Sequence, residues 1–298
     1  MRLEKEKILP LIIAALKEDI GPRDLTTSLL IAKEAAAEAE VLVRQEGVIA
    51  GLQVAEWTFA QVEPKIRFKP TVPDGERVHP GKAVAFLEGP ARGILMGERT
   101  ALNFLGRLSG IATLTRRFVD RVARSRAWIM DTRKTTPTLR LLEKYAVAMG
   151  GGAPHRMGLY DQVLIKDNHL KLISGRGNRL SPVERAVREA RSKLKPSSLI
   201  EVEAASLREF RQALSAQADI ILLDNMKISD IQEAVRLRDA VIRSKKGRQV
   251  LLEASGGVTL ETVQGIAAAG VDRISIGALT HSAPALDIAL ELIGGGAV

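Results

Sequence analysis

The 298-residue chain contains no cysteine, and aromatic residues make up only 3% of it. The lack of cysteine excludes a disulfide framework, a thiolate nucleophile and a cysteine-based zinc site. The low aromatic content argues against a platform that stacks the bases of single-stranded nucleic acid. This composition is compatible with a reducing compartment, and we expect the protein to be cytoplasmic.

The chain also lacks a long hydrophobic run. No stretch reaches the roughly 18 apolar residues of a membrane-spanning helix. The nearest imitation of a signal peptide is Ile8–Leu16, but acidic residues lie in the charged start before it and no small-residue cleavage site follows. We expect an amphipathic first helix here and no association with a membrane.

Basic residues outnumber acidic ones by 44 to 35, which gives a formal net charge of +9. The excess is compatible with an ordinary solvated surface or with an anionic partner such as nucleic acid or a phosphorylated or carboxylated substrate. No run of Lys or Arg is longer than two residues, and no nucleic-acid-binding motif is present. We therefore expect a small anionic substrate and no nucleic acid.

The second half of the chain alternates short apolar runs with helix-start signals. The runs are continuous in hydrophobicity, which is typical of strands buried on both faces of a parallel sheet. They are Ala127–Asp131, Gln162–Lys166, Leu199–Glu203, Ala218–Asp224, Gln249–Glu253 and Asp272–Ile276. Ser181, Ser206 and Ser229 each precede a Glu or Gln by three residues, which predicts a capping box at the start of a helix. The pattern predicts a parallel α/β sheet, open or closed into a barrel.

The first part of the chain lacks this alternation, and its pattern predicts a separate, smaller α+β domain over residues 1–110. The long periodic segment Gly97–Ala123 predicts a helix or helix pair that joins it to a catalytic domain over residues 111–279. We further expect a C-terminal helix over residues 280–298 that packs on the small domain.

The ends of the predicted strands carry different chemistry along the chain. The early strand ends supply basic groups, the middle ones supply carboxylates and the last ones supply glycine-rich loops. Arginine suits carboxylates, carboxylates suit Mg²⁺ or ribose hydroxyls, and glycine-rich loops before helices suit phosphate. Each feature alone is more often a surface charge, a helix cap or a turn. Together they favour phosphoribosyl chemistry at one face of a barrel.

Several motifs together resemble the quinolinate phosphoribosyltransferase family, the carboxylating nicotinate-nucleotide pyrophosphorylases. They occur in the order typical of that family and span nearly the whole chain. The matching segments are GPRDLTT (21–27), GERTALNFLGRLSGIAT (97–113), DTRKTTP (131–137), HRMGLYDQVLIKDNH (155–169), EVE (201–203), LLDN (222–225), EASGG (253–257) and GALTHS (277–282).

The resemblance implies an α/β fold with an incomplete, irregular parallel β/α barrel and a smaller N-terminal α+β sandwich-like domain. It implies a homodimer, possibly within a higher oligomer, in which Arg99 reaches the substrate of the neighbouring subunit. It implies Mg²⁺ and no organic cofactor, with Glu203 and Asp224 as the metal-binding acids. The implied catalytic residues are Lys134, Lys166, Glu203 and Asp224. The implied substrate-binding residues are Arg99, Arg133, Lys134, His155, Arg156, Lys166, Glu201, Glu203, Asp224, Ser255, Gly256, Gly257 and Gly277, with His281 close by.

The implied reaction joins quinolinate to phosphoribosyl pyrophosphate and yields nicotinate mononucleotide, pyrophosphate and CO₂, a step of de novo NAD biosynthesis. One alternative is a related phosphoribosyltransferase with a different acceptor. Another is a barrel lyase that uses Lys166 as a Schiff-base lysine. That second alternative requires a lysine held neutral in an apolar setting.

Overall fold

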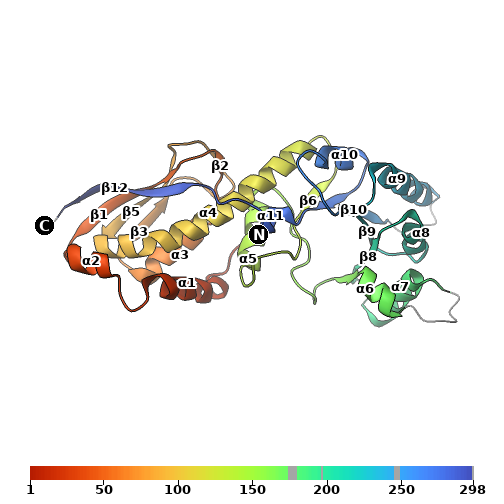
Figure 1. Cartoon of the computed structure of the whole chain (residues 1–298), viewed down its shortest axis with the longest axis horizontal. Coiled ribbons are helices and arrows are strands. Elements are labelled where there is room, and N and C mark those ends of the chain that lie inside the picture. The colour runs from red at the N-terminus through yellow and green to blue at the C-terminus, as the bar shows by residue number, and fades with distance from the viewer. Residues whose placement is uncertain (174–179, 196, 245–248, 297–298) are drawn as a thin grey trace. The chain divides into compact units, whose positions relative to one another are not determined.

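The computed structural model describes residues 1–173, 180–195, 197–244 and 249–296. These residues form two units, drawn in Figure 1. The first unit comprises Met1–Arg116, Thr135–Gly152 and Ala278–Val298, and the second comprises Arg117–Lys134 and Ala153–Gly277. The sequence predicts a domain of residues 1–110 with 280–298 packed on it and a second domain of residues 111–279, whereas the structure places Thr135–Gly152 in the first unit.

The first unit is built on a four-stranded antiparallel sheet. Its strands are β1 (Ala36–Val43), β3 (Arg67–Pro70), β5 (Ala83–Pro90) and β12 (Ile288–Gly296), in the order β12-β1-β5-β3. Side chains of β1 alternate between exposed and buried along its first half, as expected for a sheet with one face on a core. A second, two-stranded sheet pairs β2 (Gly47–Val48) with β4 (Arg77–Val78).

Helices α3 (Leu52–Val62) and α4 (Ala91–Val122) lie along this sheet and share its core (Figure 1). The unit also contains α1 (Lys5–Ile20), α2 (Leu25–Leu30), α5 (Arg140–Met149) and α11 (Ala278–His281). The core contains Phe59 of α3 and Ile94 and Leu105 of α4. The predicted first helix is confirmed, and its buried residues Ile8, Ile12 and Leu16 recur every four positions. No helix in the described ranges is both long and apolar enough to cross a membrane.

The predicted C-terminal helix is wrong. Residues Ile288–Gly296 form β12, which pairs antiparallel with β1 along its whole length. The apolar spacing of this segment fits a helix as well as a strand, and a short apolar run does not separate the two. Its glycine-rich end disfavours a helix, because glycine is a poor helix former.

The second unit contains six parallel strands in the order β6-β11-β10-β9-β8-β7. The strands are β6 (Trp128–Met130), β7 (Val163–Ile165), β8 (Ile200–Ala204), β9 (Ile220–Asp224), β10 (Leu251–Ser255) and β11 (Arg273–Ser275). Each corresponds to a strand predicted from the sequence. The helices are α6 (Asp167–Ile173), α7 (Pro182–Lys193), α8 (Leu207–Ser215), α9 (Ile228–Arg243) and α10 (Val263–Ala268). The predicted incomplete β/α barrel is confirmed.

Two of the three predicted helix caps are confirmed. Ser181 forms a complete capping box with Glu184 at the start of α7. Ser206 accepts a hydrogen bond from the backbone N–H of Glu209 at the start of α8. The cap at Ser229 is wrong, because α9 already begins at Ile228 and Ser229 lies inside its first turn.

Candidate active site

The strands of the second unit are parallel, so their carboxyl ends share one edge of the sheet. Nearly all the basic, acidic and glycine residues predicted for the site lie at this edge. Arg133 and Lys134 follow β6, Lys166 follows β7, and Glu203 and Asp224 lie at the ends of β8 and β9. Ser255 ends β10, Gly256 and Gly257 follow it, and Gly277 follows β11. The topology therefore gathers residues from six strand ends into one region of the unit.

His155 and Arg156 reach the same edge by a different route. They precede β7 in the chain, but Ala153 forms a parallel bridge with Met130 of β6. The segment from Ala153 thus runs beside β6 and in the same direction. Its end is fixed because the backbone N–H of His155 donates to Asp131 Oδ1 at 2.8 Å. His155 and Arg156 therefore lie at the carboxyl edge although they precede β7 in the chain.

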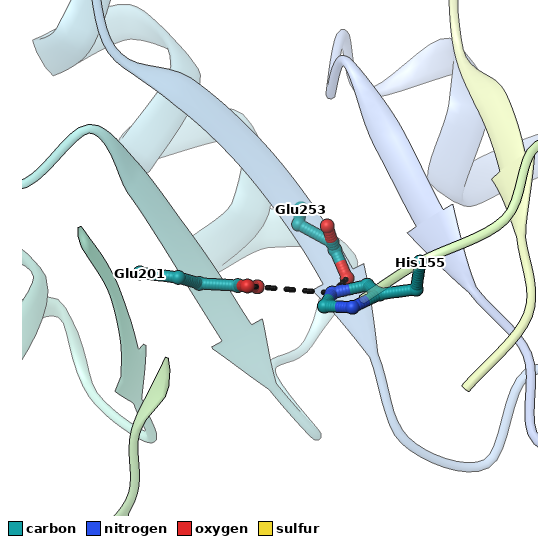
Figure 2. Close-up of side chains that lie close together, drawn as sticks. All are labelled: His155, Glu201 and Glu253. Atoms are coloured by element: carbon teal, nitrogen blue, oxygen red, sulfur yellow. Dashed lines mark ion pairs between the residues drawn. The ribbon is translucent and has the colours of Figure 1, made fainter. Parts of the chain in front are cut away.

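His155 meets two buried carboxylates, Glu201 from β8 and Glu253 from β10 (Figure 2). Its Nε2 lies 3.3 Å from Glu201 Oε2 and 3.2 Å from Glu253 Oε1. Both glutamates have no solvent-exposed surface, and the His155 side chain is 7% exposed. Its other ring nitrogen, Nδ1, accepts the backbone N–H of Arg156 at 2.7 Å.

The protonation of His155 reflects these contacts. Burial lowers the pKa of His155, but hydrogen bonds and charge interactions with Glu201 and Glu253 outweigh burial and raise the pKa to about 9. The Arg156 amide acts in the opposite direction, because a protonated Nδ1 cannot accept its N–H. We therefore place one proton on Nε2, facing the carboxylates. A second proton on Nδ1 requires loss of the Arg156 bond. Burial, with a contribution from Glu253, raises the pKa of Glu201.

Arg156 is buried and donates a hydrogen bond to the carbonyl of Gln162 at 3.1 Å. Burial lowers the pKa of Arg156, and the nearby charge of Arg133 lowers it further. In the segment between Arg156 and Gln162, Asp161 accepts the backbone N–H groups of Met157 and Gly158 at 2.6 and 3.0 Å. The loop from His155 to Gln162 is therefore internally hydrogen-bonded.

Lys166 forms an ion pair with Glu203, whose Oε1 lies 2.9 Å from Nζ. The lysine side chain is 45% exposed. The amine of Lys166 is thus bonded to an acid and partly exposed to water, whereas a Schiff-base lysine needs an apolar setting. This geometry weighs against the lyase alternative.

The turn after β10 requires glycine. Gly256 and Gly257 have φ values of 98° and 58°, a region that disfavours other residues. A Cβ on Gly256 would overlap the side-chain amide of Asn225, whose backbone N–H donates to the carbonyl of Ser255 at 2.8 Å. The loops after β9 and β10 are thus closely packed, with the side-chain amide of Asn225 directly against the backbone of Gly256.

Glu203 and Asp224 offer carboxylate oxygens from neighbouring strands, which is the ligand type that Mg²⁺ prefers. Mg²⁺ normally keeps several waters and substrate oxygens, so two protein carboxylates fit an ion that arrives with a pyrophosphate group. In the described part of the chain, the group of three acidic or histidine side chains that lie close enough to share an ion is His155, Glu201 and Glu253. Their donor atoms already face one another as a hydrogen-bonded group.

Two predicted residues lie in the first unit. Arg99 is on α4, and its side chain is 63% exposed, 3.9 Å from Glu98. His281 ends α11, with Nδ1 2.6 Å from the hydroxyl of Ser282. All the other predicted site residues lie in the second unit.

The prediction of site residues omitted three side chains that organise the edge: Glu253, Gln162 and Asp131. Glu253 holds His155, Gln162 donates from Nε2 to Glu201 Oε2 at 2.7 Å, and Asp131 holds the His155 backbone. A lone carboxylate within an apolar run was the available signal for Glu253, since a buried polar residue is more informative than an exposed one.

A cavity of about 450 Å³ lies beside the opposite, amino ends of the strands. Its lining includes Trp128, Leu251 and Arg273, the first residues of β6, β10 and β11. None of the residues predicted for the active site lines it. The carboxyl edge, not this cavity, is the candidate active site.

A parallel barrel sheet that gathers basic side chains, carboxylates and a glycine turn at its carboxyl edge defines an enzyme for a strongly anionic substrate. Two family descriptions match the chain: Quinolinate phosphoribosyl transferase, N-terminal domain, over residues 24–109, and the C-terminal domain of the same name over residues 111–291. The chain belongs to the quinolinate phosphoribosyltransferase family.

Individual relatives agree with this assignment. The chain is 42% identical over 289 residues to the chloroplastic carboxylating nicotinate-nucleotide pyrophosphorylase of Oryza sativa, covering 93% of this chain and 76% of the relative. It is 40% identical over 294 residues to the mitochondrial decarboxylating quinolinate phosphoribosyltransferase 2b of Nicotiana tabacum, covering 93% and 80%. The nicotinate-nucleotide pyrophosphorylase structure from Francisella tularensis is 35% identical, with a TM-score of 0.89 and 98% of each chain covered.

Proposed function

We propose that the protein transfers the phosphoribosyl group of phosphoribosyl pyrophosphate to quinolinate and releases CO₂, a step of de novo NAD biosynthesis. The observation that carries this proposal is the carboxyl edge of the barrel sheet, where Arg133, Arg156 and Lys166 meet acids and a glycine turn. Membership of the family and relatives named for this reaction support it.

The chemistry matches the residues available. The pyridine nitrogen of quinolinate attacks C1 of the ribose as the bond from C1 to pyrophosphate breaks, so no protein nucleophile is required. The pyridinium that forms accepts the electron pair released when the 2-carboxylate leaves as CO₂, and a proton then takes its place at C2. Arginine and lysine groups at the edge bind the two carboxylates and oppose the negative charge that grows on the leaving pyrophosphate.

The proposal assigns Glu203 and Asp224 to the ribose hydroxyls and to Mg²⁺ bound with the pyrophosphate. When bound, the ion supplies charge stabilisation for the leaving group. The ion pair of Lys166 with Glu203 holds the lysine at the edge, where its partly exposed side chain can contact an anion. The glycine turn at Gly256 and Gly257 is assigned to the 5-phosphate, since it presents backbone rather than bulky side chains.

The central experiment measures products from quinolinate, phosphoribosyl pyrophosphate and Mg²⁺, with nicotinate replacing quinolinate in a parallel reaction. Nicotinate mononucleotide and CO₂ from quinolinate alone would support the proposal. Turnover of nicotinate instead, or of neither compound, would refute it and favour a relative with another acceptor. Omission of Mg²⁺ with added chelator tests the ion and is expected to abolish turnover.

The proposal also includes a homodimer whose active sites are completed by Arg99 of the neighbouring subunit, and a cytoplasmic location. The exposed position of Arg99 on α4 is compatible with a role outside its own unit. Mixed dimers of Arg99→Ala and Lys134→Ala subunits should recover activity, because one of the two composite sites is then intact. Verified mixed dimers without activity would contradict a shared site, and cell fractionation tests the location.

A further inference from the structure

The loop that carries Arg156 is closed at both ends by one carboxylate, Glu201. At the start of the loop, Glu201 Oε2 lies 3.3 Å from His155 Nε2. At its end, the same oxygen accepts a hydrogen bond from Gln162 Nε2 at 2.7 Å. The carbonyl of Gln162 in turn accepts from the Arg156 guanidinium. Glu201 therefore holds His155, the residue before Arg156, and also Gln162, whose carbonyl binds the Arg156 guanidinium.

Glu253 anchors the same histidine from a second strand. Its Oε1 lies 3.2 Å from His155 Nε2 and also accepts the hydroxyl of Ser275 on β11. The ring is thus held between β8 and β10, as Figure 2 shows. With Nδ1 bonded to the Arg156 amide, both ring nitrogens of His155 are engaged within the protein. A substrate carboxylate would have to displace one of these bonds to contact either nitrogen.

Stability of the sheet does not require these two acids. Burying an ionised carboxylate costs several kcal/mol unless it is fully hydrogen-bonded. Among the described residues, Glu201 Oε1 and Glu253 Oε2 have no hydrogen-bond partner, and the Arg273 guanidinium lies 3.9 Å from Glu253 Oε2, beyond hydrogen-bond distance. Apolar residues at these strand positions would pack the barrel interior without that cost. The acids are therefore explained better by what they hold than by packing.

We infer that Glu201 and Glu253 are positioning residues, which clamp His155 and the 155–162 loop so that Arg156 is presented to the anionic substrate. His155 then acts on the substrate through Arg156 rather than by direct contact. The assignment also removes Glu201 from the ribose-binding acids. The kinetic test of this inference depends on the proposed function, whereas the proteolysis test does not.

The kinetic test is a double-mutant cycle between His155→Ala and Arg156→Ala. If His155 acts through Arg156, the double variant should lose no more than about threefold in kcat/KM beyond Arg156→Ala alone. If His155 binds quinolinate itself, the two losses multiply, and the inference is overturned. His155→Gln can still donate an N–H to the carboxylates and is expected to stay within about fivefold of wild type. A folded His155→Gln enzyme as defective as His155→Ala would also overturn it.

Glu201→Ala should raise KM for quinolinate about tenfold or more while leaving KM for phosphoribosyl pyrophosphate within about threefold. A rise only in KM for phosphoribosyl pyrophosphate would show that Glu201 serves the ribose instead. The matched control is Asp219→Asn. Asp219 is another buried acid of the same unit, and it bonds Arg191 and the Ile200 amide away from the loop. This control should lower stability without changing either KM.

A second readout does not depend on activity. Trypsin cleaves after arginine, and the bond after Arg156 lies within the clamped loop. Glu201→Ala should speed cleavage at Arg156 about tenfold or more relative to cleavage at exposed Arg236, whereas Asp219→Asn should not change this ratio. Unchanged cleavage at Arg156 would refute the clamp even if the enzyme is active. Conversely, a wild-type protein without turnover but with this cleavage pattern would refute the proposed function and leave the clamp standing.

Discussion

Removal of the Glu143 carboxylate is expected to destabilise the first unit strongly. Glu143, on α5, is fully buried and accepts hydrogen bonds from the Arg107 guanidinium at 2.8 and 3.2 Å. It also accepts the backbone N–H and hydroxyl of Thr136 at 3.1 and 2.8 Å. Arg107 in turn donates to the carbonyls of Thr280 and Ala283. One ion pair thus ties α4 and α5 to the segments around Thr136 and α11.

The magnitude follows from what Glu143→Ala leaves behind. Arg107 loses its counter-charge, and two donors of Thr136 lose their acceptor. Removal of one partner from a buried ion pair costs about 3–5 kcal/mol. The Arg107 side chain is 28% exposed, so water can reach part of the guanidinium. We therefore expect a loss near the lower end of this range, about 3 kcal/mol.

Urea unfolding followed by tryptophan fluorescence measures this loss. The chain has two tryptophans, and Trp57 lies on α3 of the first unit. A Trp128→Phe background makes Trp57 the only reporter, and a lower midpoint at an unchanged slope indicates a change in stability. Glu4→Ala is the matched control because the Glu4–Lys7 pair in the same unit is exposed, and it should cost less than about 1 kcal/mol.

A Glu143→Ala variant within about 1 kcal/mol of wild type would refute the reasoning, since a buried partner cannot be lost so cheaply. A double substitution gives an independent check. Arg107→Met with Glu143→Leu removes both charges and should be less destabilised than the sum of the two single substitutions.

Three further predictions concern other contacts. Tyr145 donates to Asp74 Oδ2 at 2.6 Å, and burial raises the pKa of its phenol above 10, so Tyr145→Phe should cost about 1–2 kcal/mol at pH 8. Above pH 10 the unfolded phenol ionises and the folded one does not, so urea unfolding should show this deficit shrinking by up to about 1.4 kcal/mol per pH unit; a constant deficit would contradict the shift. A Cβ on Gly110 would overlap the Pro284 carbonyl, whereas one on Gly265 meets only the flexible end of Ile228. Thermal unfolding should therefore show Gly110→Ala destabilised by at least about 2 kcal/mol and Gly265→Ala within about 1 kcal/mol of wild type. Lys134→Ala, at an exposed strand end, should lower kcat/KM about a hundredfold or more with an unchanged unfolding midpoint, and a joint loss of fold and activity would contradict its placement.

The strands of the barrel could be predicted because each is a short, continuous apolar run followed by a polar strand end. Parallel pairing then implies that Lys166, Glu203 and Asp224 share an edge, even without knowledge of the strand order. Register and order depend on contacts distant in sequence. They were not predictable, and they decide which side chains meet.

The C-terminal strand shows the limit of local pattern. Residues 288–296 carry apolar groups at a spacing that suits either secondary structure, and the partner that decides between them is β1, some 250 residues earlier (288 − 36 = 252). The same limit applies to Thr135–Gly152, which lies in the first unit although strands of the second unit flank it in sequence. In both cases a long-range contact, not local propensity, settles the structure.

His155 illustrates the limit at the site itself. The sequence marks it as a strand-end histidine, but its partners lie 46 and 98 residues away (201 − 155 and 253 − 155). Only strand order places both acids beside one ring. The structure places Nε2 of this histidine against the two buried carboxylates, and its contact with the substrate stays a prediction.

The arrangement of charge explains how several basic groups can lie close together at the carboxyl edge of the barrel sheet. Burial and, to a smaller extent, repulsion from Arg133 lower the pKa of Arg156, and Glu201 and Glu203 act in the opposite direction. Together with Lys166, these two arginines give three basic groups against the three carboxylates Glu201, Glu203 and Glu253, so the net charge of this group is small. Two of the acids have no exposed surface, whereas Lys166 is partly exposed. Water screens buried charges less than exposed ones, so these buried acids can attract the neighbouring basic groups strongly and hold them in place. An anionic substrate can therefore reach the partly exposed Lys166 from solvent, whereas Glu201 and Glu253 are shielded from it.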